Sequence, residues 1–108
     1  MLPRVEQQLN TMVDQIKEQI PIDEIILFGS YAYGMPESDS DIDLCFILYG
    51  NHEKKIDILR HIRRVIAPYA NMPIDILVYY KDEFNDRANL TSTMEYKIRN
   101  EGVKLYEQ

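Results

Sequence analysis

The chain has 108 residues, the length of one ordinary domain, so we expect residues 1–108 to fold around a single hydrophobic core. Its 12 Lys and Arg against 18 Asp and Glu give a net charge of −6, which argues against a broad electrostatic contact with nucleic acid. The apolar runs are far shorter than the ~20 residues of a membrane helix, so we expect no membrane span. The N-terminus lacks an apolar signal-peptide core, and the single Cys45 cannot form an internal disulfide. Both observations favour a reducing cytoplasm.

The first half of the chain predicts a helix followed by two strands. Residues 3–19 carry apolar side chains at steps of three and four, the spacing of a helix that buries one face. Pro21 ends this helix, and the Ile-rich run Glu24–Phe28 predicts a short buried strand. We then expect a brief helical turn and a loop over residues 31–40, followed by a strand over residues 41–49.

The middle of the chain predicts a helix and a third strand. Residues 52–67 form an amphipathic pattern that ends before Pro68, and the expected apolar face comprises Ile56, Leu59, Ile62 and Ile66. Ile74–Tyr80 predicts a buried strand entered through a proline. Residues 81–90 are assigned to no element.

The last segment predicts another helix and a final strand. Ser92 and Glu95 match a capping box, and Gly102 is a suitable stop. The expected apolar face comprises Leu90, Met94 and Ile98. Residues 103–106 then predict a strand. This order of elements indicates an α/β protein, α+β in some classifications, with helices packed on a small sheet.

Three aspartates occupy strand positions in which a charge is costly. Asp41 and Asp43 point to the same face, about 6.6–6.8 Å apart along their strand. Asp75 lies within an apolar strand, where an unpaired charge destabilises the fold. Because Mg²⁺ prefers carboxylate oxygens, we predict that the three acids share bound Mg²⁺. The alternatives are a solvated start of the strand for the first two acids and a structural ion pair for Asp75.

The turn after the first strand predicts a phosphate site. Gly29 allows the backbone to come close to a bulky anion, and we expect any side chain there to push the backbone away from the phosphates. Ser30 adds a hydroxyl donor, and free N–H groups follow it. A tight turn with a helix cap is the structural alternative, and it is compatible with phosphate binding.

These motifs resemble a known signature. Gly29-Ser30, then ten residues, then Asp41-Ile42-Asp43, is similar to the pattern of the DNA polymerase β-like nucleotidyltransferase superfamily. The resemblance extends over nearly the whole chain and implies a small mixed β-sheet with helices packed on it. It implies that Asp41, Asp43 and Asp75 are catalytic and bind two Mg²⁺ ions, and that ATP, held by Gly29 and Ser30, is the substrate.

Within that superfamily the short chain resembles the minimal nucleotidyltransferases, which are often paired with a small helical HEPN protein as antitoxin and toxin. The resemblance implies transfer of AMP from ATP to a hydroxyl, a tyrosine of the HEPN partner, in a homo- or hetero-oligomer. Two alternatives stay open. One is a non-catalytic antitoxin or binding module that covers its partner, and the other is a small-molecule nucleotidyltransferase.

Two further residue types have competing interpretations. Tyr31 and Tyr33 follow the phosphate turn, where a ring can stack on a nucleobase. Cys45 lies within an apolar run, which favours a buried, inert thiol over a catalytic one.

Overall fold

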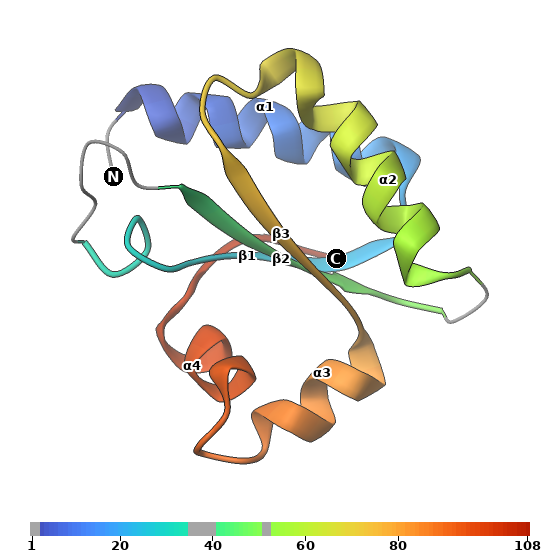
Figure 1. Cartoon of the computed structure of the whole chain (residues 1–108), viewed down its shortest axis with the longest axis vertical. Coiled ribbons are helices and arrows are strands. Elements are labelled where there is room, and N and C mark those ends of the chain that lie inside the picture. Colours follow the sequence, from blue (N-terminus) through green and yellow to red (C-terminus); the bar gives the residue numbers. More distant parts are fainter. Residues whose placement is uncertain (1–2, 35–40, 51–52) are drawn as a thin grey trace.

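The computed structural model describes residues 3–34, 41–50 and 53–108, whose strands form a four-stranded sheet between two layers of helices (Figure 1). The strands are β1 (Ile22–Phe28), β2 (Ile42–Leu48), β3 (Ile74–Tyr80) and β4 (Val103–Glu107). Their order across the sheet is β3-β2-β1-β4. β2 and β3 are parallel, and β1 is antiparallel to both β2 and β4. The predicted small mixed sheet with packed helices is therefore confirmed.

One face of the sheet is covered by α1 (Pro3–Gln19) and α2 (Lys55–Ile66), which the 3-10 turn η1 (Ala67–Tyr69) follows (Figure 1). The predicted bounds and apolar face of α1 are confirmed, because its buried residues are Val5, Leu9, Met12, Val13 and Ile16. The predicted face of α2 is partly wrong. Ile58, Ile62 and Ile66 are buried, whereas Ile56 is 49% exposed. Ile56 lies about 200° around the helix from Ile58, so both cannot face the sheet.

The opposite face is covered by α3 (Lys81–Ala88) and α4 (Met94–Glu101). Phe84 of α3 and Ile98 of α4 pack against the sheet in a second apolar cluster with Ile26, Cys45 and Ile47. The sheet is thus buried on both sides along β2, which explains the nearly continuous apolar sequence of that strand.

The start of α4 differs from the prediction. Thr93, not Ser92, is the N-cap, and its Oγ1 accepts a hydrogen bond from the N–H of Tyr96 at 3.1 Å. The predicted apolar face is partly wrong, because Ile98 is buried but Leu90 is 61% and Met94 50% exposed. Beside Ile98 the helix buries an acid, Glu95, whose carboxylate has partners inside the protein.

The end of α4 depends on a glycine, as predicted, but for a steric reason. A Cβ at Gly102 would lie 2.5 Å from Cγ2 of Ile26 and 2.5 Å from the carbonyl oxygen of Ile98. The chain therefore passes directly over β1 before it pairs with β1 as β4.

Strand and helix ends account for the remaining differences. β1 begins at Ile22 rather than at residue 24, because Ile22 pairs with Leu48 and is buried. The predicted start of the second helix, at residue 52, lies outside the described residues, and α2 begins at Lys55. Within the described ranges, no helix has both the length and the apolar character that a membrane crossing requires.

Candidate active site

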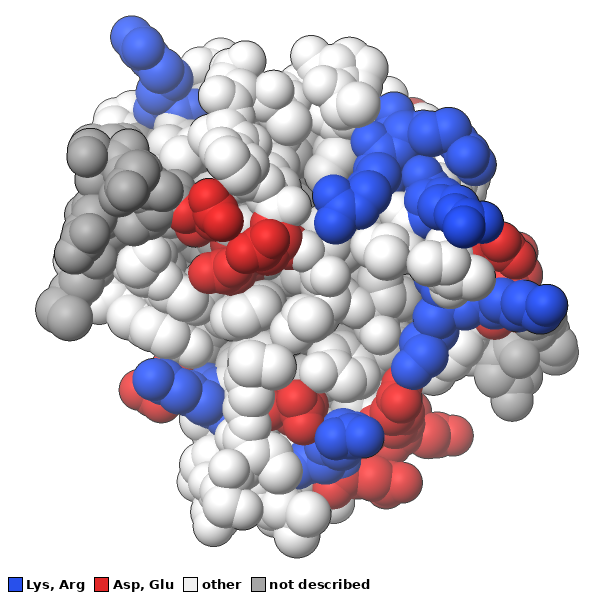
Figure 2. Space-filling view, viewed as in Figure 1, with Lys and Arg blue, Asp and Glu red and all other residues white. Residues whose placement is uncertain are grey.

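Two of the predicted acids lie side by side. Asp43 of β2 and Asp75 of β3 are direct partners in the parallel ladder, so their side chains leave the sheet on the same face about 4.8 Å apart at the backbone. That face is the one that α3 and α4 cover further along, because Asp43 alternates in phase with Cys45 and Ile47. Acidic side chains form a patch on this side of the molecule near the starts of β2 and β3 (Figure 2).

The Asp43 carboxyl is in an unfavourable place for a negative charge. Burial is the largest cause that raises the pKa of Asp43. The charge of Asp75, the hydrogen bond with Asp75 and the charge of Asp41 raise this pKa further. Within the described ranges, no ion pair includes any of these three acids. A bound cation or a proton would relieve the repulsion.

The paired carboxylates of Asp43 and Asp75 suit a divalent cation. No three His, Cys, Asp or Glu side chains of the described residues gather closely enough to hold a metal ion by themselves. Asp41 directly precedes β2, and its charge still acts on Asp43. Mg²⁺ is commonly held by one or two carboxylates together with substrate phosphates and water, and the Asp43–Asp75 pair suits that coordination.

Gly29 lies directly against the Asp43 carboxylate. Phe28, the last residue of β1, pairs with Asp43 across the antiparallel ladder, and the chain then turns at Gly29 with a φ of 75°. A Cβ at this position would lie 2.0 Å from Oδ2 of Asp43. The sequence predicts a glycine that leaves room for phosphate, whereas the side-chain space at position 29 is taken by the acid. The turn and the acids therefore form one continuous site.

The turn itself is short and hydrogen-bonded. The carbonyl oxygen of Gly29 accepts N–H bonds from Ala32 and from Tyr33, each at 3.0 Å, as the predicted helical turn requires. Ser30 lies half-buried inside this turn.

The two tyrosines of the turn have different environments. Tyr31 is 9% exposed and its hydroxyl donates to Sδ of Met72 at 4.0 Å, so the predicted stacking of Tyr31 on a nucleobase is wrong. Its ring belongs to the core because the turn directs it back under the sheet with α1. Tyr33 is half-exposed, and its ring lies 4.7 Å from Nζ of Lys97 on α4.

Comparison with known proteins decides the family. The model of the nucleotidyltransferase domain family matches residues 9–100, which include both strands of the acidic pair and the Gly29 turn. The chain belongs to the nucleotidyltransferase domain family. No curated protein matches this nucleotidyltransferase.

Solved structures with the same fold cover most of the nucleotidyltransferase. One, described as a nucleotidyltransferase from Sulfolobus solfataricus, has a TM-score of 0.66 and 21% identity over 97% of this chain and 82% of its own. A toxin–antitoxin complex with AMP-PNP has a TM-score of 0.60 and 20% identity, over 95% of this chain and 73% of its own. A complex of the tri-AMPylated Shewanella oneidensis HEPN toxin with its MNT antitoxin has a TM-score of 0.56 and 20% identity, over 94% and 73%. These matches confirm the predicted fold.

On the same face of the sheet, further along β1, the nucleotidyltransferase has a buried ionic network that the sequence does not predict. Glu24 of β1 is 4% exposed, and its Oε1 lies 2.8 Å from Arg99 of α4 and 3.1 Å from Lys104 of β4. Burial alone would raise the pKa of Glu24, but the hydrogen bonds to Arg99 and Lys104 outweigh it, so the pKa is lowered. The only signal in the sequence is an acid inside an Ile-rich run. The network fixes α4 against β1.

Other buried groups of the nucleotidyltransferase are structural. Cys45 is fully buried, and burial raises the pKa of its thiol, which confirms the predicted inert cysteine. Tyr79 of β3 donates its hydroxyl to Oε2 of Glu95 at 2.9 Å, which accounts for the buried acid of α4.

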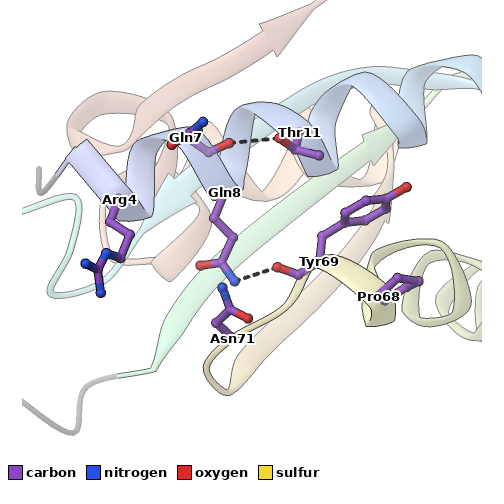
Figure 3. Close-up of a pocket in the computed structure, with 7 residues that line it drawn as sticks. All are labelled: Arg4, Gln7, Gln8, Thr11, Pro68, Tyr69 and Asn71. Carbon is purple, nitrogen blue, oxygen red and sulfur yellow. Dashed lines mark hydrogen bonds between the residues drawn. The ribbon is translucent and has the colours of Figure 1, made fainter.

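A hollow of about 320 Å³ lies on the other face of the sheet, between the first half of α1 and the segment after α2 (Figure 3). Gln8 crosses it and donates to the carbonyl oxygen of Tyr69 at 2.7 Å. Because α1 and Asp43 are on opposite faces, this hollow is separate from the acidic site.

Proposed function

We propose that this nucleotidyltransferase is a metal-dependent protein adenylyltransferase that moves AMP from ATP to a tyrosine hydroxyl of a HEPN-type partner, and so acts as an antitoxin in the cytoplasm. The observation that carries the proposal is the pairing of Asp43 with Asp75 beside the Gly29 turn. The solved relatives support it, since one complex contains AMP-PNP and another contains a tri-AMPylated HEPN toxin with its MNT antitoxin.

In this proposal the acids bind the metal ion and the turn binds the outer phosphates of ATP. Asp43 and Asp75 would hold Mg²⁺, which supplies charge neutralisation at the phosphates and lowers the pKa of a bound hydroxyl. The backbone N–H groups that follow Gly29, with the Ser30 hydroxyl, would donate to the outer phosphates. Asp41 adds negative charge near the pair and so favours cation binding.

The reaction requires one proton acceptor. The tyrosine oxygen forms a bond to the α-phosphorus, the bond from that phosphorus to the oxygen bridging to the β-phosphate breaks, and pyrophosphate leaves. Asp75 is more exposed than Asp43 and belongs to the edge strand β3, so we assign it the hydroxyl proton.

The position of β3 supports a macromolecular acceptor. Among the described strands β3 is at the edge of the sheet, and most of its residues are only half-buried. A tyrosine on the surface of another protein can therefore approach Asp75 across this edge without entering a deep pocket.

The test uses the purified chain, a HEPN-type partner, Mg²⁺ and ATP labelled at the α-phosphate, with γ-labelled ATP as the matched control. We expect the α-label alone to appear on partner tyrosines and to disappear on tyrosine-to-phenylalanine substitution in the partner. Inhibition of the partner without any label would instead favour the non-catalytic binding module. Label on a small hydroxyl compound and never on protein would favour a small-molecule transferase.

A further inference from the structure

Lys97 brings a positive charge to the Gly29 turn from a distant part of the chain. It lies on α4, and its Nζ is 4.7 Å from the centroid of the Tyr33 ring. The N–H of Tyr33 in turn bonds to the carbonyl oxygen of Gly29. The turn and α4 are both on the left of the view in Figure 1, and the contact between Lys97 and Tyr33 joins them. Because Gly29 lies against the Asp43 carboxylate, this contact is close to the acidic pair.

The turn has no positive side chain of its own. Residues 29–34 read Gly-Ser-Tyr-Ala-Tyr-Gly, and the neighbouring acids contribute only negative charge. The outer phosphates of ATP carry several negative charges, and bringing them to this surface is favourable only with cations close by. A metal held by the acids would neutralise part of this charge, and a positive side chain from another element would add to it.

Other basic residues of the same side of the sheet are paired. Lys81 lies 3.6 Å from Asp23, and Arg87 lies 3.8 Å from Glu95. Arg99 and Lys104 lie 2.8 Å and 3.1 Å from Glu24. No ion pair among the described residues includes Lys97, which is exposed.

The contact with Tyr33 positions this charge without neutralising it. The face of an aromatic ring attracts an ammonium group, but more weakly than a charge-assisted hydrogen bond to a phosphate oxygen. The flexible stem of a lysine then allows Nζ to leave the ring for a phosphate without movement of the helix.

We propose that Lys97 is a nucleotide-binding residue that contacts the outer phosphates of ATP, and that Tyr33 holds its side chain beside the Gly29 turn until the nucleotide binds. The inference rests on the proposed function in taking ATP as the substrate. It adds a residue from α4, and therefore makes the second helical layer part of the phosphate site.

The test compares Lys97→Ala and Lys97→Arg with Lys17→Ala. Lys17 is exposed on α1, at the opposite face of the sheet, and its loss changes the net charge by the same amount. By calorimetry in Mg²⁺ buffer we expect Lys97→Ala to weaken ATP binding by about 10- to 100-fold, with AMP affinity unchanged. Lys97→Arg should keep most of the ATP affinity, and Lys17→Ala all of it.

A second probe separates this inference from the proposed function. Inorganic tripolyphosphate with Mg²⁺ carries the outer phosphates but no nucleoside. If tripolyphosphate binding depends on Lys97 but the protein never transfers AMP, the phosphate-binding role of Lys97 is supported and the proposed function is overturned. If the wild type transfers AMP but Lys97→Ala binds ATP and tripolyphosphate as tightly as the wild type, the role of Lys97 is overturned and the proposed function is supported. A wild type that binds neither ATP nor tripolyphosphate would overturn both.

Discussion

Replacement of Gly29 by alanine tests the contact between the turn and the acidic pair. The added Cβ would lie 2.0 Å from Oδ2 and 2.9 Å from Cγ of Asp43, so the carboxylate has to leave its place beside Asp75. The backbone adds its own cost, because a φ of 75° places an L-residue in the left-handed region, at about 1–2 kcal/mol. For a domain of this size each 1 kcal/mol lowers Tm by roughly 4–8 °C.

Gly34→Ala is the matched control. Gly34 has a φ of 81° and a Cβ there meets nothing within 4 Å, so it carries the backbone cost without the clash. We expect both variants to melt below the wild type and Gly29→Ala to melt lowest. In Mn²⁺ titrations without nucleotide, Gly29→Ala alone should lose affinity. If the two variants melt together and Gly29→Ala binds Mn²⁺ like the wild type, Gly29 does not hold Asp43 in position.

Four further substitutions test the acidic pair and the buried network around Glu24. Asp43→Asn should raise the metal-free Tm, because it removes one of two adjacent charges, and should weaken Mn²⁺ binding; a lower metal-free Tm would contradict the repulsion. Asp75→Asn should weaken ATP·Mg²⁺ binding, because it removes one of the two carboxylates that would hold the cation, and at saturating ATP·Mg²⁺ labelled AMP transfer should still fall by at least ~10²-fold; native transfer would make Asp75 a structural acid. Arg99→Met should lower the free energy of unfolding, measured with denaturant, by about 1–3 kcal/mol, because Lys104 would then be the one remaining ion-pair partner of the buried Glu24 among the described residues. Since the pKa of Glu24 is lowered by folding, its ionised form stabilises the protein above the ordinary value of 4.5. The stability advantage of wild type over Glu24→Gln should therefore disappear as the pH falls below that value, and a constant advantage would contradict it.

The long periodic segments were predictable because burial of one face leaves a repeat in the sequence. The apolar spacing of residues 3–19 and the runs that became β2 and β3 need no knowledge of their neighbours. Short signals failed where two choices differ by one residue. Ser92 and Thr93 both suit an N-cap, and in the structure the Thr93 hydroxyl also donates to the carbonyl oxygens of Arg87 and Leu90, contacts that the sequence pattern does not carry.

The composition of the site was predictable, but its contacts were not. Alternation along a strand relates Asp41 to Asp43, whereas the closer neighbour of Asp43 is Asp75, from a strand 32 positions later. That relation depends on strand order and register, which periodicity does not carry. The same holds for Glu24 and Arg99, which are 75 positions apart.

The burial of Tyr31 has a consequence for the thermodynamics of nucleotide binding. Its hydroxyl reaches Met72 in the segment that leads into β3, and the carbonyl oxygen of Pro73 accepts the N–H of Ile42 at 3.0 Å. Contacts through the core thus connect the turn that follows β1 to the first residues of β2 and to the segment that precedes β3. A ligand meets donors and acids that already keep their relative positions, so little of its binding free energy is consumed in ordering the protein. We therefore expect amide exchange of Ala32 and Tyr33, whose N–H groups already bond to the carbonyl oxygen of Gly29, to be slow before ATP is added and to change little afterwards.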